Sequence, residues 1–312
     1  MASRSSSVSE VYLSITAMIA AAIWTFAALS AQSADFYGDF DWRKHDGGNY
    51  STPVRNQGSC GSCWAFGSVA SLESQFEINA GDPNLNLDLS EQHLLCDGSA
   101  GSCDGGYSYK ANNFFVDNGI VDEATLPYEA SDTSPNWPLD QPYDVYKVSG
   151  VDNWIDSSRT NIKNTLENEG PLSCAINTDD WYSPSSAQVG SSMDFSVSDG
   201  VLWDSAGVLG ASEDPLGGVN HSVAIVGYED DSSMEEGGYW IVKNSWGSGW
   251  GDDGYGFFKY GDIEKHDRVH SITGDTFIET IPEPSSLILL ALGALVAVIL
   301  NNRRRGAAHP AD

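Results

Sequence analysis

Basic residues are scarce in this sequence. Only 15 lysines and arginines stand against 44 aspartates and glutamates, which gives the 312-residue chain a formal net charge of −29. Proteins that bind nucleic acids neutralise phosphates with basic side chains, whereas a strongly acidic surface favours solubility. The charge balance therefore excludes nucleic acid as an expected partner, although it carries no information about the fold.

Internal repeats and low-complexity tracts are absent between residues 35 and 280. The chain is 41% apolar and 11% aromatic, which is a globular composition. Its length is sufficient for one large domain or two modest ones. Residues 35–280 are therefore expected to form the folded part of the protein.

The first 34 residues do not read as part of the fold. They begin with Arg4, continue with an apolar run over residues 11–29, and end in small residues up to Ala34. This order is typical of a secretory signal peptide, with cleavage expected between Ser30 and Ala34. An uncleaved membrane anchor is the alternative.

The C-terminal end has a three-part pattern. Pro282-Glu283-Pro284 precedes an apolar run of 14 residues, 287–300, and Arg303-Arg304-Arg305 follow. A bilayer-spanning helix needs about 20 residues, so only a thin span is expected, with the arginines on the cytoplasmic side. The pattern resembles the PEP-CTERM sorting signal of Gram-negative bacteria, which implies processing by a sorting enzyme of exosortase type. Segment 281–306 is assigned to this signal and 307–312 to a short tail; an ordinary C-terminal anchor is the alternative.

Five cysteines lie in the expected folded part, and their number is odd. An exported protein can keep disulfides, but an odd count leaves at least one thiol free, and such a thiol is a candidate reactive group. These residues are Cys60, Cys63, Cys96, Cys103 and Cys174.

The expected secondary structure changes halfway along the folded part. Apolar residues follow Cys63 at helical spacing, which predicts that this cysteine lies at or near a helix N-terminus. Short apolar or alternating runs between Gly- and Asp-rich turns predict strands in the second half, so the fold class is α+β in two lobes. The expected helices cover residues 63–79, begin at Glu91 after the N-cap Ser90, end near Asn118-Gly119, and contain Ile162 and Leu166 before Gly170-Pro171. The expected strands are Leu172 to Ile176, His221 to Tyr228, Tyr239 to Lys243 and Tyr255 to Tyr260.

A thiol nucleophile has chemical requirements that restrict where it can lie. The thiolate is the reactive form, and a helix N-terminus supplies about half a positive charge that stabilises it. A histidine must take the proton, a further group must orient that histidine, and donors must face the developing oxyanion.

Each requirement has a candidate in the sequence. Residues 57–66 contain Cys-Gly-Ser-Cys-Trp around Cys63; His221 begins an expected strand, and Asn244 ends the next one. These segments resemble the papain family of cysteine peptidases, in the family's order Gln, Cys, His, Asn. The resemblance spans about Trp42 to Tyr260 and implies a two-lobed fold, with a helical first lobe, a β-barrel-like second lobe and the active site between them. Three further segments carry it: LSEQHLLC (89–96), CDGGYS (103–108) and GIVDEATLPYEA (119–130).

The resemblance implies a role for each matching residue. Cys63 corresponds to the nucleophile, His221 to the general acid/base, and Asn244 to the residue that orients the histidine. Gln57 corresponds to the side-chain donor of the oxyanion hole, and the Cys63 N–H is the second donor. Trp246 corresponds to the ring that shields the His–Asn bond from water.

Substrate-binding positions follow from the same resemblance. A strip of glycines would pair with an extended substrate backbone, and small residues would wall the pocket for the second substrate residue upstream of the cut. Such walls suggest that an apolar side chain enters. The positions are Gly61, Gly105, Gly106, Ala175, Val219, Ser222 and Trp246.

The resemblance also implies a Cys60–Cys103 disulfide and leaves Cys96 and Cys174 free, although a bond between those two stays open. Without the resemblance, Cys60, Cys63, Cys96 and Cys103 are also compatible with a four-thiolate zinc site. Zinc leaves the surroundings of His221 and Asn244 unexplained, so no metal and no cofactor are expected.

Three departures from the family pattern stand out. Cleavage after Ala34 would leave 28 residues before Cys63, fewer than an inhibitory propeptide needs. Cys63 lies 158 residues before His221 and 181 before Asn244, against a usual spacing of roughly 130–150. The surplus is expected in loops 179–218 and 229–238, which would border the cleft. The end of the domain, 261–280, does not align.

The sequence therefore predicts a cysteine endopeptidase acting on polypeptides as a monomer. It is expected in the periplasm, on the cell surface or outside a Gram-negative-type bacterium, with transient membrane association through the tail. An inactive papain-like binding module and an exopeptidase or transpeptidase on the same scaffold are the alternatives.

Overall fold

The structure is a computed structural model that describes residues 38–133, 142–178, 218–261, 263–264 and 268–282. The chain divides into one unit that ends at Gly38 and a second that begins at Asp39, and every element below belongs to the second unit. The predicted signal peptide and nearly all of the predicted sorting segment lie outside the described residues.

The helices that the structure describes all precede β5, and four of the five lie in the first half of the chain, which was predicted to be mostly helical. The longest, α2, begins at Cys63 and is buried along most of its length. It ends where Gly81 has a φ of 62°, a left-handed conformation that glycine adopts without steric cost. Ser90 caps α3 by accepting a hydrogen bond from the His93 N–H, which confirms the predicted start of that helix. The helices are η1 (Trp42–Gly47), α2 (Cys63–Ala80), α3 (Glu91–Asp97), α4 (Ser108–Asp117) and α5 (Arg159–Glu169).

An antiparallel sheet dominates the second half. Its strand order is β4-β9-β5-β6-β7-β8. The short strand β1 lies outside this order and pairs with β6. The four predicted strands are present as β5 to β8, and together with the helices they confirm the α+β class. The strands are β1 (Phe40–Asp41), β2 (Gly101–Ser102), β3 (Gly105–Gly106), β4 (Tyr143–Asp152), β5 (Leu172–Ile176), β6 (His221–Asp230), β7 (Gly238–Lys243), β8 (Tyr255–Lys259) and β9 (Val269–Ile281).

Two long strands, β4 and β9, were not predicted. β9 is buried over its first four residues, 269–272, and mostly exposed beyond them, while β4 has two fully buried positions, Val145 and Val148. Neither pattern alternates with a period of two residues, which is the sequence signal of a strand with one buried face. Their pairing with each other, from Tyr143 opposite Ile281 onward, defines them instead.

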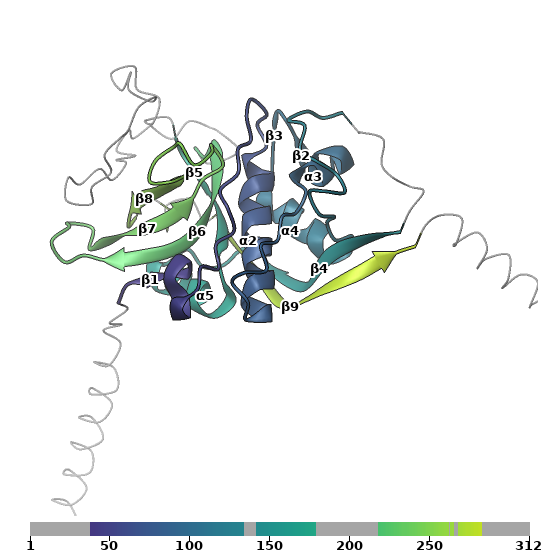
Figure 1. Cartoon of the computed structure of the whole chain (residues 1–312). Helices are drawn as coiled ribbons and strands as arrows, with labels where there is room; N and C mark the ends of the chain where they lie inside the picture. Colours follow the sequence, from purple (N-terminus) through teal and green to yellow (C-terminus); the bar gives the residue numbers. More distant parts are fainter. Residues whose placement is uncertain (1–37, 134–141, 179–217, 262, 265–267, 283–312) are drawn as a thin grey trace, which may run out of the picture. The chain divides into compact units, whose positions relative to one another are not determined.

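Helix α2 lies at the centre of the folded unit. Figure 1 shows it between the sheet of β5 to β8 and the region that contains α3, α4 and β4. It contacts β5, β6 and β9 on one side and α3 and α4 on the other. This central position places the first residue of α2, Cys63, where the helical and β-rich parts meet. The largest core cluster gathers around it and includes Trp64, Val69, Leu72, Phe76, Leu94, Phe115 and Ile120.

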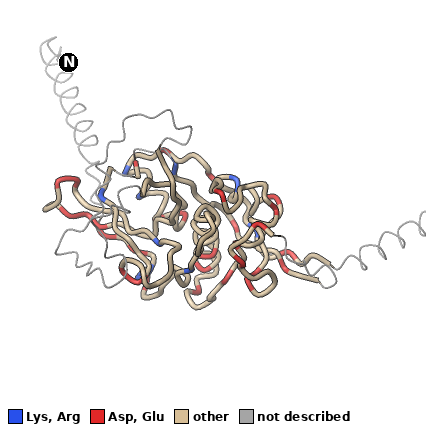
Figure 2. Tube along the Cα trace, turned by 90° about the horizontal axis from the view of Figure 1, so that it is seen from above, with Lys and Arg blue, Asp and Glu red and all other residues tan. Residues whose placement is uncertain are grey.

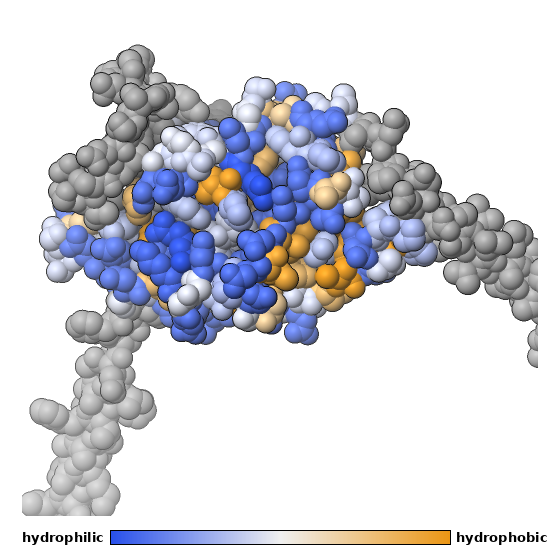
Figure 3. Space-filling model, in the orientation of Figure 1, coloured by the Kyte–Doolittle hydropathy of each residue, from blue (hydrophilic) through white to orange (hydrophobic). Residues whose placement is uncertain are grey.

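The surface reflects the composition. In Figure 2, acidic residues are spread over many loops and element ends, whereas lysines and arginines are few and scattered. Figure 3 shows a face that is mostly hydrophilic, with apolar areas toward the side of β4 and β9; Phe277 and Ile278 on β9 are exposed there. Within the described ranges, none of the helices combines the length and apolar character that a bilayer-crossing segment requires.

Candidate active site

A cleft of about 590 Å³ opens between the helical part and the sheet. Its walls come from the start of α2, the β2–β3 hairpin, β5 and the start of β6. All of the sequence-predicted site residues line it except Asn244, which lies behind it. The predicted residues in the wall are Gln57, Cys60, Gly61, Cys63, Cys103, Gly105, Gly106, Ala175, Val219, His221, Ser222 and Trp246.

Cys63 is the first residue of α2 and is positioned by the loop before it. The Ser62 Oγ lies 2.6 Å from the Tyr128 hydroxyl, and this hydroxyl donates a hydrogen bond of 2.8 Å to the Gln57 carbonyl oxygen. The Gly61 N–H donates to the Cys103 carbonyl oxygen over 2.8 Å. The thiol therefore lies at the positive end of a helix dipole. The loop before it is held in place by several hydrogen bonds.

His221 and Asn244 occupy two neighbouring strands of the sheet. His221 is the first residue of β6, and Asn244 directly follows β7. The His221 Nε2 lies 2.8 Å from the Asn244 Oδ1. Because a carboxamide oxygen can only accept, Nε2 carries the hydrogen, which leaves Nδ1 as the nitrogen that can take up a proton. The structure brings together these two residues, which the sequence suggested because His221 begins one apolar strand and Asn244 follows the next.

Trp246 covers the His–Asn pair. Its ring centroid lies 4.7 Å from that of His221, and the ring of Trp250 packs against it edge-on at 5.4 Å. Asn244 is 3% exposed and His221 is 7% exposed, so water has little access to the bond between them. A hydrogen bond screened in this way is stronger than one in water.

The same burial changes the proton affinities of the site. Burial raises the pKa of the Cys63 thiol, and backbone N–H groups of Ser222, Trp64 and Cys63 itself partly offset this effect. Burial also lowers the pKa of His221 to about 4, against the opposing effect of the Asn244 hydrogen bond. Each group taken alone is therefore neutral near pH 7.

The Gln57 carboxamide is held firmly beside the thiol loop. Its Oε1 accepts a hydrogen bond of 2.7 Å from the Ser245 Oγ, and its Nε2 donates over 2.8 Å to the Cys60 carbonyl oxygen. A primary amide has two N–H donors, so one remains for a ligand. The Gln57 N–H also donates to the Ser245 carbonyl oxygen over 2.8 Å.

The glycines of the cleft are required by close backbone approaches. A Cβ on Gly106 would lie 2.5 Å from the Trp64 ring, and one on Gly61 would lie 2.5 Å from the Cys103 carbonyl oxygen. Gly105 has a φ of 122° and open space around it. The β2–β3 hairpin can therefore present a bare backbone edge to an extended chain.

Cys60 and Cys103 form a disulfide, the pair that the family resemblance implies. It joins the thiol loop to the glycine hairpin. The zinc alternative fails because two of its four thiols are bonded to each other. Cys96 is half-buried and Cys174 is buried, both as free thiols, so the structure does not join these two.

Sequence reasoning missed part of the cleft wall. Tyr107, Tyr109, Arg268 and His270 also line it. The tyrosines follow the glycine hairpin directly, so the motif there could have indicated them. Arg268 and His270 belong to the end of the domain that did not align, and only the pairing of β9 with β5 brings them to the cleft.

One predicted loop does not border the cleft. Residues 229–238 comprise the last two residues of β6, the connection 231–237 and the first residue of β7, and no residue of this range lines the cleft. The expectation was wrong for a geometric reason: β6 begins at the cleft with His221 and runs away over 10 residues, about 33 Å of extended chain. The other predicted loop, 179–218, lies outside the described residues except at its last position.

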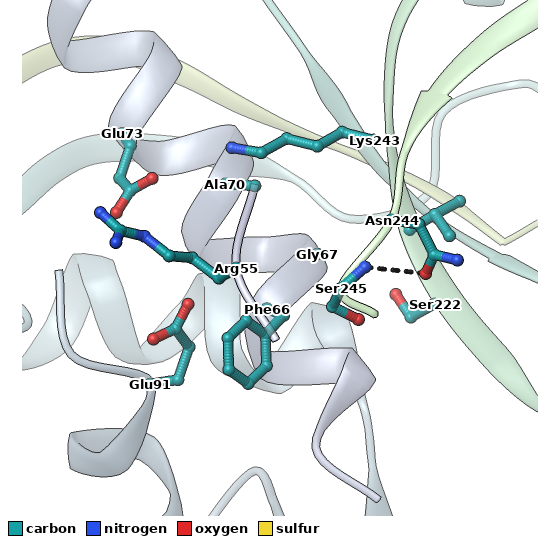
Figure 4. Close-up of a pocket in the computed structure, with 11 residues that line it drawn as sticks. Arg55, Phe66, Gly67, Ala70, Glu73, Glu91, Ser222, Lys243, Asn244 and Ser245 are labelled. Carbon is teal, nitrogen blue, oxygen red and sulfur yellow. Dashed lines mark hydrogen bonds between the residues drawn. The ribbon is translucent and has the colours of Figure 1, made fainter. Parts of the chain in front are cut away.

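A group of charged residues, buried except for Arg55, lies behind the site. In Figure 4, the side chains of Arg55 and Lys243 point toward Glu73. The Lys243 Nζ donates over 2.8 Å to the Thr52 Oγ1, which in turn donates to Glu73. Burial raises the pKa of Glu73, raises that of Glu91 well above its usual value, and lowers that of Lys243. Because Lys243 immediately precedes Asn244, this charged group supports the strand end that carries the site.

The α+β fold, with a helical lobe and a sheet lobe on either side of a thiol–imidazole cleft, defines the class of protein. Residues 37–271 match the family model described as papain family cysteine protease. The chain belongs to this family. Residues 280–305 match the PEP-CTERM protein-sorting motif.

Curated relatives include cysteine proteinase 1 of Entamoeba histolytica, 35% identical over 220 residues, which cover 69% of this chain and 61% of the relative. The viral cathepsin of Adoxophyes honmai nucleopolyhedrovirus is 33% identical over 219 residues, 70% of this chain and 55% of the relative. The chain thus spans between half and two thirds of these relatives' length.

Solved structures show the same papain-like fold. Digestive procathepsin L2 proteinase from Tenebrio molitor larval midgut aligns with a TM-score of 0.59 and 29% identity, over 78% of this chain and 70% of that chain. The Carica candamarcensis cysteine protease CMS1MS2, solved in complex with E-64, aligns with a TM-score of 0.56 and 28% identity, over 76% and 98% of the two chains. The two-lobed papain-like fold that the sequence predicted is confirmed.

Proposed function

We propose that this protein is an exported cysteine endopeptidase that cleaves peptide bonds through Cys63 and His221. The observation that carries the proposal is the buried 2.8 Å bond from His221 Nε2 to Asn244 Oδ1, beside a cleft that also contains the helix-terminal Cys63. This bond orients the imidazole so that its other nitrogen can exchange a proton with a group in the cleft. The family membership supports the same conclusion.

The reaction begins with transfer of the Cys63 proton to the Nδ1 of His221. Burial opposes each charge separately, but the transfer creates a thiolate and an imidazolium together, and their mutual attraction offsets much of that cost. The helix N-terminus and the Ser222 and Trp64 N–H groups stabilise the thiolate further. The Asn244 carboxamide oxygen stabilises the imidazolium.

The thiolate then attacks the carbonyl carbon of the substrate peptide bond. Negative charge moves to the carbonyl oxygen, where the Gln57 amide and the Cys63 N–H donate hydrogen bonds. His221 gives its proton to the leaving amine, and a thioester between Cys63 and the first half of the substrate remains. A water molecule, deprotonated by His221, hydrolyses this thioester and restores the thiol.

The proposed substrates are polypeptides bound in extended form. The bare backbone of Gly105 and Gly106 offers hydrogen-bonding groups to such a chain, and Ala175, Val219 and Ser222 wall a pocket beside it. The PEP-CTERM match at residues 280–305 supports export in a Gram-negative bacterium and a sorting enzyme of exosortase type as partner. Transient membrane association through this segment and a monomeric state belong to the same proposal.

Labelling with E-64 tests the catalytic proposal directly. The full-length protein should gain the mass of one inhibitor molecule, and the Cys63→Ala variant should gain none. Cys96→Ala is the matched control because Cys96 is also a free, half-buried thiol, and this variant should label like the wild type. Absence of labelling, together with no hydrolysis of denatured protein or dipeptidyl fluorogenic substrates, would favour an inactive binding module instead.

The lengths of the products then separate the two enzymatic alternatives. An endopeptidase should release internal fragments of many lengths from a denatured protein at early times. An exopeptidase should release only single residues or short peptides from one end. Mass spectrometry of the first products distinguishes these patterns.

A further inference from the structure

An aromatic group adjoins the cleft: Tyr109 and His270 line it, and the exposed Trp154 packs against both rings. The ring centroids of Tyr109 and Trp154 lie 5.4 Å apart, and those of Trp154 and His270 lie 5.2 Å apart. The His270 Nδ1 is hydrogen-bonded to the Asn153 carbonyl oxygen, which holds the ring in place. Rings fixed in this way form a firm wall for the apolar part of a side chain.

Arg268 reaches this wall through the register of the sheet. The Ala175 N–H donates over 3.0 Å to the Arg268 carbonyl oxygen, and Ala175 is paired with Ser222 on β6. Arg268 therefore lies two strand spacings, about 10 Å, from the backbone next to His221. An extended substrate advances about 3.3 Å per residue, so the side chain of the second residue upstream of the cut can span this distance.

Among the described residues that line the cleft, Arg268 is the one permanently positive side chain. The described lining contains a single acid, Asp104, which is exposed on the turn of the glycine hairpin across the cleft. Burial lowers the pKa of His270 to about 4, and although Asp152 opposes this shift, the ring is neutral at pH 7. The Arg268 guanidinium lies 5.8 Å from the Trp154 ring centroid, and it makes no ion pair with any residue that the structure describes.

We propose that Arg268 selects an acidic side chain in the second substrate residue upstream of the cut. The inference rests on the proposed peptidase function. The planar guanidinium matches a carboxylate with two parallel hydrogen bonds, and the surrounding rings keep the pair partly out of water. Tyr109 and the small walls of Ala175 and Val219 accept the methylene stem of glutamate. A purely apolar pocket, as the small walls alone suggest, would instead discriminate against the charge.

Paired fluorogenic dipeptidyl substrates test this selection. The two substrates differ only in glutamate or glutamine at the second position, so they have nearly the same size and shape. For the wild type, kcat/KM should favour glutamate by roughly three- to tenfold, the factor expected between exposed and desolvated charge pairs. Each rate is divided by the concentration of active sites titrated with E-64, so that differences in the fraction of folded enzyme do not affect kcat.

Variants of Arg268 should move this ratio in a defined direction. Arg268→Gln should bring the glutamate-to-glutamine ratio to about one. Arg268→Glu should reverse the preference toward a lysine substrate. Lys110→Gln is the matched control, because it removes an equal charge that lies 4.9 Å from the Tyr107 ring but outside the cleft wall. Its ratio should equal that of the wild type.

Two failures are distinguishable. If the enzyme takes the label and cleaves leucine substrates, but shows no glutamate preference or keeps it in Arg268→Gln, the assignment of Arg268 is overturned and the peptidase function stands. If no substrate is cleaved and no label is taken up, the proposed function itself is wrong.

Discussion

Asn244 holds the histidine through a single atom. Its Oδ1 accepts hydrogen bonds of 2.8 Å from both His221 Nε2 and the Ser245 N–H, whereas its buried Nδ2 has no hydrogen-bond partner in the described part of the chain. The side chain therefore contributes one oriented acceptor and carries a desolvation cost for its unpaired amide group. What distinguishes Asn244 is therefore the position of its one acceptor, which lies against the imidazole of His221.

The Asn244→Ala variant should lose activity more than stability. Loss of the acceptor lets the imidazole rotate and removes a partner of the imidazolium, so kcat should fall roughly 10- to 100-fold, as expected for about 1.5–3 kcal/mol of a charged hydrogen bond. KM should change little, since Asn244 does not line the cleft. Steady-state kinetics on one dipeptidyl substrate measures both constants.

A second buried asparagine provides the control for this prediction. Asn112 on α4 is fully buried, and neither of its side-chain polar atoms has a hydrogen-bond partner among the described residues. Asn112→Ala should therefore leave kcat within about twofold of the wild type. Equal losses of kcat in both variants would show that the Asn244 effect is structural.

At the residue scale, the predictions that agree with the geometry of the structure came from local sequence motifs. Cys63, His221 and Asn244 each lie at the boundary of an element with a strong apolar pattern, so neighbouring residues in the sequence indicate their position. Arg268 and His270 have no such local signal. Their place in the cleft depends on the pairing of two strands far apart in the sequence, which no single segment encodes.

Helix α2 does more than present Cys63 at its first residue. Glu77, near its C-terminal end, is 2% exposed, and its Oε2 makes no hydrogen bond within the described residues. Burial, followed by the nearby charge of Glu73, raises the pKa of Glu77 from 4.5 to about 7. The helix therefore contains a carboxyl group that prefers to be protonated in the folded state.

This shift predicts a pH-dependent stability. The folded-state pKa of Glu77 lies above the unfolded value, so its stabilising contribution is complete below about pH 4.5 and is lost as the pH rises through about 7. The Glu77→Gln variant mimics the protonated form. Its free energy of unfolding, relative to the wild type, should therefore increase by about 2–3 kcal/mol between pH 4.5 and pH 8.

Urea denaturation at several pH values measures this difference. Glu129→Gln is the control, because Glu129 is an exposed acid and its substitution should leave the difference flat with pH. If the Glu77→Gln and Glu129→Gln curves run parallel, Glu77 is ionised in the folded state at neutral pH and the prediction is wrong.

At the element scale, sequence patterns predicted helices and half-buried strands well but missed β4 and β9. A strand with a mixed burial pattern has no period-two signal, and its stability comes from its partner. The nine residues 273–281 of β9 are mostly exposed, so the sequence alone gave no reason to extend the sheet to Ile281.

At the scale of the whole molecule, the two lobes are joined by buried charge as well as by apolar contacts. Lys243 at the end of β7 is 5% exposed, and Glu73 in the middle of α2 is 2% exposed. The Thr52 hydroxyl bridges them, and the Leu89 N–H donates over 2.9 Å to the other Glu73 oxygen. Figure 4 shows the Lys243 side chain extending toward Glu73 from the strand end that carries Asn244. The division into a helical and a β-rich half was predictable, but these buried partners were not, because charged residues in a sequence are expected at the surface.

Replacing one partner should damage the molecule more than replacing both. Lys243→Met removes the buried cation that reaches the Glu73 carboxylate through Thr52, which should cost about 3–5 kcal/mol of unfolding free energy. The Glu73→Gln substitution in the same chain removes that unpaired charge while keeping an acceptor for Leu89. The double variant should therefore recover at least half of the loss.

A double-mutant cycle measured by urea denaturation decides between coupling and simple packing. If the two side chains stabilise each other through charge, the losses in the single variants should exceed that of the double variant, with a coupling energy of about 1–3 kcal/mol. Additive losses would mean that Lys243 contributes only the packing of its alkyl stem. Because Lys243 adjoins Asn244, a coupled result would also connect the lobe interface to the orientation of His221. The rate of E-64 labelling should then fall in Lys243→Met and recover in the double variant together with stability.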